Sequence, residues 1–243
     1  MAIKSYSPEV MVSTVYNTNH IHKEDEQNEF VNRVTSVFPR LHGLVIGPGM
    51  GRNPFVLKSV EKIVECAKEI DLPLVLDADG LFLLSQKPEL LKHYHNAVIT
   101  PNIVEYRRIS EAMKLEHDAD ISEFTKRLGG PTVIRKGRVD TICGFSGDTD
   151  AERVTMICDA RGSPRRPGGL GDFLAGTTIV LLSWSVRRYG GTSANLTVVV
   201  SHPFSLTFSP NCRYEKNVQS SYACMSCCYN RCSRGKSACL YKA

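Results

Sequence analysis

The sequence predicts an α/β fold in which a mostly parallel sheet lies between two layers of helices. Short apolar runs alternate with longer segments whose apolar residues recur at helical spacing. Strands that alternate with helices of about 10–15 residues form parallel sheets, because each crossover helix packs back onto the sheet. The apolar runs end at Gly, Pro or Asp, and ligands bind beyond the carboxyl ends of the strands in such folds.

Four short apolar runs are expected to be the parallel strands. They are Gly43–Ile46, Leu74–Leu76, Ala97–Thr100 and Thr132–Arg135. Two later runs, Thr141–Phe145 and Arg153–Cys158, are separated by a segment containing Ser-Gly-Asp-Thr-Asp and predict an antiparallel pair.

Helices are predicted where apolar residues recur every three or four positions. Phe55–Ile70 has the longest such pattern, and Pro101 ends a strand just before the next strong helical segment. The expected helical segments are Phe55–Ile70, Gly80–Leu84, Pro88–Tyr94, Asn102–Met113, Ile121–Leu128 and Asp172–Ser185.

Composition divides the chain near Arg187. The 243 residues are 42% hydrophobic and 23% charged, as is typical of a globular protein. Residues 187–243 contain eight of the basic residues, one acid and six of the nine cysteines, whereas residues 1–186 contain 22 basic and 24 acidic residues. We therefore expect a domain over residues 1–186, followed by a basic, cysteine-rich and poorly ordered tail. Because the excess of positive charge lies in the tail, the net charge of +5 does not indicate nucleic-acid binding.

Targeting and membrane signals are not apparent in the sequence. No run of 18 apolar residues occurs, so we expect no membrane span. The first residues form neither a signal peptide nor a transit peptide, which predicts a cytoplasmic protein. In the tail, Cys224 and Cys227 have zinc-ligand spacing, but a second well-spaced pair is missing, which favours a tail without metal.

A glycine-rich segment before the last predicted helix is the most informative motif. It runs Gly162-Ser-Pro-Arg-Arg-Pro-Gly-Gly-Leu-Gly-Asp172 and contains no Walker sequence. Glycines let backbone N–H groups approach an anion closely, and a helix amino terminus adds partial positive charge. Arg165 and Arg166 are suited to phosphate. Asp172 then either takes a proton from a hydroxyl or caps the helix.

Five motifs, in order along the chain, resemble those of the ribokinase-like superfamily, and within it the ATP-dependent (S)-NAD(P)H-hydrate dehydratases. They are Leu44-Val-Ile-Gly-Pro-Gly-Met-Gly-Arg52, Val75-Leu-Asp-Ala-Asp-Gly-Leu81, Val98-Ile-Thr-Pro-Asn-Ile-Val-Glu-Tyr106, Val133-Ile-Arg-Lys-Gly-Arg-Val-Asp140 and the glycine-rich segment. The resemblance implies a ribokinase-like three-layer α/β/α sandwich. It spans Ile3 to Trp184, so we expect a variant with a truncated amino terminus, a divergent carboxyl terminus and a sheet incomplete at both ends.

The resemblance also implies site residues. The catalytic base would be Asp172, which would also contact the substrate. The other substrate-binding residues would be Gly49, Gly51, Asn102, Ile103, Val104, Glu105, Tyr106, Arg107 and Arg108. The ATP-binding residues would be Lys136, Gly137, Arg138, Val139, Asp140, Gly162, Ser163, Pro164, Arg165, Arg166, Pro167, Gly168, Gly169, Leu170 and Gly171.

Several of these residues also have a purely structural interpretation. Asn102 and Glu105 would equally well cap a helix. The residues of Lys136–Asp140, taken alone, favour a polar hairpin turn, and only the resemblance implies that this segment contacts ATP. The resemblance also implies that Arg52 would reach the phosphates of the substrate. Asp77 and Asp79 end a strand, where they would hold Mg²⁺ through waters or form a turn.

The implied activity is the ATP- and Mg²⁺-dependent dehydration of the 6S hydrate of NADH or NADPH, which restores the normal cofactor. The resemblance also implies functional pairing with an NAD(P)H-hydrate epimerase, and a homo-oligomer is possible. One alternative is a kinase for a small alcohol such as a vitamin precursor. Another is a catalytically dead truncated variant, or an interaction module acting through its tail.

Overall fold

The fold is that of a computed structural model, which describes residues 5, 7, 9–17, 23–145, 153–159, 168–189 and 212–214. One seven-stranded sheet runs through it in the order β1 to β7, so each strand pairs with the next one along the chain. The strands are β1 (Leu44–Ile46), β2 (Leu74–Leu76), β3 (Ala97–Ile99), β4 (Thr132–Arg135), β5 (Asp140–Phe145), β6 (Arg153–Cys158) and β7 (Cys212–Tyr214).

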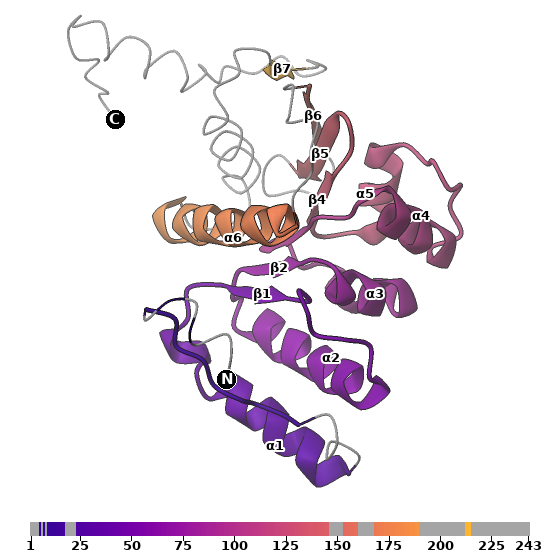
Figure 1. Ribbon diagram of the computed structural model, residues 1–243. Coiled ribbons are helices and arrows are strands. Elements are labelled where there is room, and N and C mark those ends of the chain that lie inside the picture. Colours follow the sequence, from indigo (N-terminus) through magenta and orange to yellow (C-terminus); the bar gives the residue numbers. More distant parts are fainter. Residues whose placement is uncertain are drawn as a thin grey trace, which may run out of the picture.

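The sheet has a parallel half and an antiparallel half. The first four strands pair in parallel, with Val75 opposite both Val45 and Val98. Strands β4 to β7 pair antiparallel, and β5 and β6 form the predicted antiparallel pair over six residues each. The predicted sheet is therefore present, and an antiparallel extension lies on one side of it (Figure 1).

Helices cover both faces of the sheet, which gives the predicted three layers (Figure 1). The α-helices are α1 (Glu24–Thr35), α2 (Pro54–Glu69), α3 (Asp79–Gln86), α4 (Ile103–Ala112), α5 (Ile121–Leu128) and α6 (Leu170–Tyr189), with the short 3-10 helices η2 (Phe38–Arg40) and η3 (Pro88–Leu91). Alternation of side chains along each strand divides the core between the two faces.

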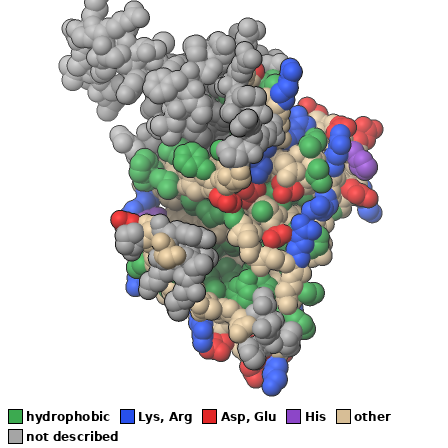
Figure 2. Space-filling model, in the orientation of Figure 1, with side chains coloured by type: hydrophobic (Ala, Val, Ile, Leu, Met, Phe, Trp, Pro, Cys, Tyr) green, Lys and Arg blue, Asp and Glu red, His purple; other side chains and the backbone are tan. Residues whose placement is uncertain are grey.

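The larger core lies between the sheet and helices α1 to α5. In β2, Leu74 and Leu76 face these helices, whereas Val75 faces the opposite side and packs near Ala175 and Leu182 of α6. Helix α6 is apolar on most of its surface, because its sequence is hydrophobic with little amphipathic bias. Its outward side chains Leu170, Phe173, Val180 and Trp184 are exposed, and Figure 2 shows apolar side chains along this helix, while charged side chains crowd the surface of α4 and α5.

Three elements had no counterpart in the sequence analysis: α1, the short 3-10 helix η2 and β7. Helix α1 buries Gln27, Phe30 and Val31 and packs on α2. Its three buried positions follow helical spacing, but most of the helix is polar, so the pattern is weak. Strand β7 pairs with β6. No described helix is long and apolar enough to span a bilayer.

Candidate functional site

The carboxyl ends of the parallel strands form one edge where the predicted motifs meet. A parallel bridge between Asn102 and Lys136 continues the β3–β4 pairing past the end of both strands. The Lys136 N–H donates to the carbonyl of Pro101 at 2.8 Å. This pairing holds the start of the β4–β5 connection against the start of α4.

An ion pair crosses this edge from β4 to β2. The Lys136 Nζ lies 2.8 Å from Asp77 Oδ1, and the Asp77 side chain is 5% exposed against 23% for Lys136. A buried carboxylate is costly unless a charge and hydrogen bonds compensate it. Lys136 provides that compensation, and within the described residues its ammonium group bonds to no other side chain.

The amino terminus of α6 reaches the same ion pair from the other face of the sheet. A Cβ on Gly171 would lie 3.3 Å from Asp77 Oδ2 and 3.9 Å from Lys136 Nζ. Such a Cβ would be tight against the Asp77 carboxylate and in ordinary contact with the Lys136 ammonium group, so the backbone of Gly171 lies directly beside the ion pair. The first N–H groups of a helix have no intrahelical acceptor, so α6 directs unpaired donors and partial positive charge towards this edge.

The residues around Gly171 leave space for a ligand. A Cβ on Gly168 or Gly169 would meet no described atom within 4 Å, and Gly169 has φ +86°. Asp172 is exposed in the first turn of α6. No residue in the described part of the chain bonds to its carboxylate. The predicted ATP-binding residues Gly162, Ser163, Pro164, Arg165, Arg166 and Pro167 lie outside the described residues.

The glycine turn after β1 borders this edge. Gly47 has φ +123°, and a Cβ on it would lie 1.8 Å from the Asp77 carbonyl oxygen, so only glycine fits. Gly49 (φ +68°) and Gly51 (φ +78°) also have left-handed backbone but face open space. A ligand can therefore approach the backbone of this turn closely, as the substrate-binding prediction requires.

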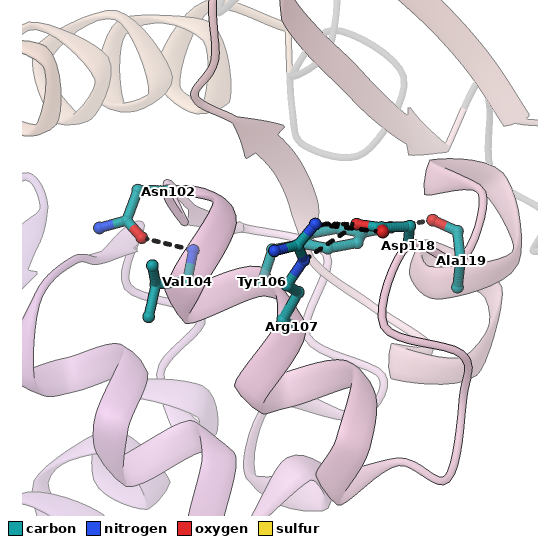
Figure 3. Close-up of polar contacts among 6 residues, drawn as sticks. All are labelled: Asn102, Val104, Tyr106, Arg107, Asp118 and Ala119. Carbon is teal, nitrogen blue, oxygen red and sulfur yellow. Dashed lines mark hydrogen bonds and ion pairs between the residues drawn. The ribbon is translucent and has the colours of Figure 1, made fainter.

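The start of α4 is a complete capping box. Asn102 Oδ1 accepts from the N–H groups of Val104 and Glu105 at 2.9 and 3.0 Å, and Glu105 Oε2 accepts from the Asn102 N–H at 2.8 Å. The structural interpretation of these two residues is thus present (Figure 3). Ile103 and Val104 remain 41% and 61% exposed beside them and offer an apolar contact surface.

Tyr106 and Arg107, in the second half of the predicted substrate-binding segment, point away from Asn102 and the edge of the sheet. Tyr106 is fully buried, stacks on Phe124 with ring centroids 4.1 Å apart, and donates its hydroxyl to the Ala119 carbonyl at 2.9 Å. Burial raises the pKa of Tyr106. Arg107 forms a two-pronged ion pair with Asp118. Both side chains reach the connection between α4 and α5, away from Asn102 (Figure 3).

The remaining predicted residues are spread along the edge. The Arg108 side chain extends from α4 towards α3, and its guanidinium carbon lies 5.7 Å from the ring centroid of Phe82. In the β4–β5 hairpin, the Gly137 N–H donates to Asp140 Oδ1 at 2.8 Å, and Arg138 and Val139 are exposed. The hairpin interpretation is therefore correct for the backbone, and its exposed tip leaves the ATP-binding prediction open.

Two contacts at this edge had no signal in the sequence. Both oxygens of Asp79 are engaged by the glycine turn, from the Gly51 N–H at 2.9 Å and from Arg52 Nε at 3.0 Å. Tyr16, 34 positions before Met50 in the sequence, donates its hydroxyl to the Met50 carbonyl at 3.0 Å. Long-range pairs of this kind leave no local pattern.

Within the described residues, no three His, Cys, Asp or Glu side chains are grouped to hold a metal ion. Asp79 has both oxygens occupied, and Asp77 has one oxygen on Lys136. Mg²⁺ retains several waters and commonly binds substrate phosphates with only one or two carboxylates. Among the described residues, Asp77 Oδ2 is the carboxylate oxygen at this edge that would be left to contact an ion carried by a nucleotide.

Comparison with known proteins decides the family. A family model described as NAD(P)H-hydrate dehydratase matches residues 1–204. The chain belongs to the NAD(P)H-hydrate dehydratase family. Proteins named ATP-dependent (S)-NAD(P)H-hydrate dehydratase are similar to it: the human one is 40% identical over 190 residues, the rat one 38% over 191 and the grapevine (Vitis vinifera) one 38% over 196. Each match covers 76% of this chain.

This member of the NAD(P)H-hydrate dehydratase family spans about half the length of those relatives, between 50% and 53% in these three. Solved structures agree on the fold. A ribokinase-like superfamily protein from Enterococcus faecalis has a TM-score of 0.56 at 20% identity, covering 85% of this chain and 66% of that one. A hypothetical protein from Streptococcus mutans has a TM-score of 0.54 at 17% identity, covering 82% and 63%. The ribokinase-like fold is therefore as predicted.

Proposed function

We propose that this chain catalyses the ATP-dependent dehydration of the 6S hydrate of NADH or NADPH. One observation carries the proposal. Gly171 at the amino terminus of α6 lies against the Asp77–Lys136 pair, and the exposed Asp172 follows it directly. A helix amino terminus suited to phosphate, a lysine and an exposed carboxylate are groups that support phosphoryl transfer to a hydroxyl.

Asp172 is the proposed base. The hydrate has a hydroxyl group on its reduced nicotinamide ring. Asp172 takes the proton of that hydroxyl while the hydroxyl oxygen attacks the γ-phosphorus of ATP. ADP leaves, and the ring then bears a phosphate ester. Loss of this phosphate, together with a proton from the neighbouring ring carbon, restores the dihydronicotinamide double bond.

The rest of the edge holds the two substrates. The N–H groups at the start of α6 and the ammonium group of Lys136 bind the ATP phosphates, with the exposed Arg138 beside them. Gly49 and Gly51 accept the nicotinamide substrate against bare backbone, next to Ile103 and Val104. When bound, Mg²⁺ on ATP neutralises phosphate charge. Much of the rate would come from positioning the hydroxyl in line with the phosphate.

The direct test is regeneration of NADPH from its 6S hydrate with ATP and Mg²⁺, followed at the absorbance band of the reduced nicotinamide. We expect turnover by the chain and a loss of at least about 100-fold in Asp172→Asn, because a general base contributes about 10²–10⁴-fold. ATP binding should persist in the variant. Glu123→Gln, which removes an exposed acid from the first turn of α5, is the matched control and should retain full activity.

The outcome also separates this activity from that of a small-alcohol kinase. A dehydratase releases inorganic phosphate and NADPH in equal amounts, whereas a kinase accumulates a stable phosphate ester that phosphorus NMR detects. A soluble, folded sample with no turnover, or an Asp172→Asn variant as active as the wild-type chain, would reject the proposal. The proposed partner is an NAD(P)H-hydrate epimerase, which would supply the 6S form.

A further inference from the structure

Asp79 occupies a position that the proposed reaction leaves without a role. It is the first residue of α3, its side chain is 21% exposed, and it joins the β2–α3 connection to the glycine turn after β1. Oδ2 accepts from the Gly51 N–H at 2.9 Å, and Oδ1 accepts from Arg52 Nε at 3.0 Å. One carboxylate therefore fixes both the backbone and the side chain of adjacent residues, 27 and 28 positions away in the sequence.

The backbone around Asp79 is held in an unusual conformation. Ala78, immediately before it, has φ +49° and ψ −115°, a region that residues with a Cβ rarely adopt. Such strain persists only where the surroundings over-determine it, and it is common at ligand sites. Close packing supplies that constraint, because a Cβ on Gly80 would lie 2.7 Å from the Ile46 carbonyl oxygen and one on Gly47 even closer to Asp77.

Arg52 is fixed at two points by α3. Asp79 accepts from its Nε, and its guanidinium carbon lies 4.5 Å from the ring centroid of Phe82, one helical turn further along α3. Its side chain is nevertheless 53% exposed, and its two Nη groups bond to no residue in the described part of the chain. A guanidinium held by Nε and one face presents its Nη donors in a fixed direction, which suits phosphate oxygens.

We propose that Asp79 is a positioning residue for the dinucleotide substrate: it holds the Gly51 N–H in place and aims the Arg52 guanidinium at the substrate's phosphates. This inference rests on the proposed function for the identity of the substrate. Asp79 itself repels phosphate, so it acts through Arg52 and Gly51. Its effect should therefore appear in the affinity for the dinucleotide and not in the phosphoryl transfer or in ATP binding.

The test compares Asp79→Asn, Arg52→Ala and the double variant with the wild-type chain. Asparagine keeps the size of the side chain but retains one acceptor oxygen, so it cannot serve both donors. KM for the 6S hydrate of NADPH, KM for ATP and kcat are measured, together with the Kd of NADPH itself from its fluorescence. Thermal unfolding midpoints check that each variant is folded, and Glu29→Gln, which breaks an exposed ion pair with Arg33 on α1, is the matched control.

We expect Asp79→Asn and Arg52→Ala each to raise KM for the hydrate and Kd for NADPH about tenfold, the scale of one charge-assisted hydrogen bond. KM for ATP and kcat should stay within about twofold, an effect too small to count as the loss of a hydrogen bond. In the Arg52→Ala background, Asp79→Asn should have a smaller effect than in the wild-type chain, because only the bond to the Gly51 N–H is left for it to disturb. Glu29→Gln should match the wild type.

Other outcomes overturn the inference. If Asp79→Asn raises the two KM values equally, or lowers only kcat, Asp79 acts on the whole domain or on the chemistry. If its effect is fully retained in the Arg52→Ala background, it does not act through Arg52. If the chain binds NADPH with this dependence on Asp79 but produces no NADPH from the hydrate, the proposed function fails while the positioning role stands. If the chain does not bind NADPH at all, both fail.

Discussion

The ion pair between Asp77 and Lys136 gives the sharpest prediction about stability. At 2.8 Å, two unit charges attract by about 6 kcal/mol at an effective dielectric constant of about 20. Desolvation of the nearly buried Asp77 offsets much of this, so the net value of the pair is small. Removing only Lys136, however, leaves a buried charge without a partner, and such changes cost about 3–5 kcal/mol.

We therefore expect Lys136→Met to lower the free energy of unfolding by about 3 kcal/mol, the low end of that range because Lys136 is 23% exposed and water screens part of the effect. Unfolding by urea, followed by circular dichroism, measures the change. Replacing both charges, as in the Lys136→Met/Asp77→Asn double variant, should recover most of the loss, because no unpaired charge then remains.

A surface pair supplies the matched control. Lys87 pairs with Glu61 on the surface, and both side chains are about a third exposed. Pairs of this kind contribute about 1 kcal/mol or less, so Lys87→Met should shift the urea midpoint only slightly. The reasoning is refuted if Lys136→Met and Lys87→Met are equally stable, or if the double variant at the buried pair is less stable than Lys136→Met alone.

Two further predictions concern backbone strain and alkaline stability. Gly47→Ala should destabilise the fold by more than about 3 kcal/mol in urea unfolding, because its Cβ would lie 1.8 Å from a carbonyl oxygen at φ +123°. Gly176→Ala, in open space on α6, is the control and should stabilise the fold by about 1 kcal/mol. The same change in unfolding free energy for both variants would contradict this prediction. Burial raises the pKa of Tyr106, so the stability linked to its proton is complete below the ordinary tyrosine pKa of about 10 and is lost as the pH rises through the raised value. Tyr106→Phe should be about 1 kcal/mol less stable at neutral pH, because it lacks the hydrogen bond to the Ala119 carbonyl. Above pH of about 10, the stability of this variant should fall less steeply with pH than that of the wild-type chain. Parallel plots of stability against pH for the two proteins would contradict this.

Local patterns were sufficient to predict most of the elements. Strands β2, β4 and β6 and helix α5 have the bounds expected from apolar runs and helical spacing, and the other predicted elements differ by a few residues at their ends. Burial on one face of a helix or on both faces of a strand requires a particular order of residues, so the sequence records it directly. Helix α1 was not predicted, because only three of its residues are buried and its apolar pattern is therefore weak.

The residues of the candidate site were predicted as motifs, but their partners were not. The sequence indicated Lys136, Gly171 and Asp172 by resemblance to a family, and left Asp77 and Asp79 equally suited to a metal and to a turn. The structure gives these two aspartates different roles: Asp77 is buried on Lys136, and Asp79 is bound to the glycine turn. Tyr106 and Arg107, adjacent to Glu105, turn away because successive helical residues point in different directions.

By itself, the sequence determined the family, the α/β class and the positions of the glycines that border the candidate site. These features can be predicted from short segments taken in order along the chain, because each segment carries its own pattern of residues. The tertiary structure alone decided that Asp77 pairs with Lys136, 59 positions away in the sequence, and that Gly171 lies beside both side chains. Such contacts depend on which strands are neighbours and on which face a helix packs, and no single segment encodes those relations.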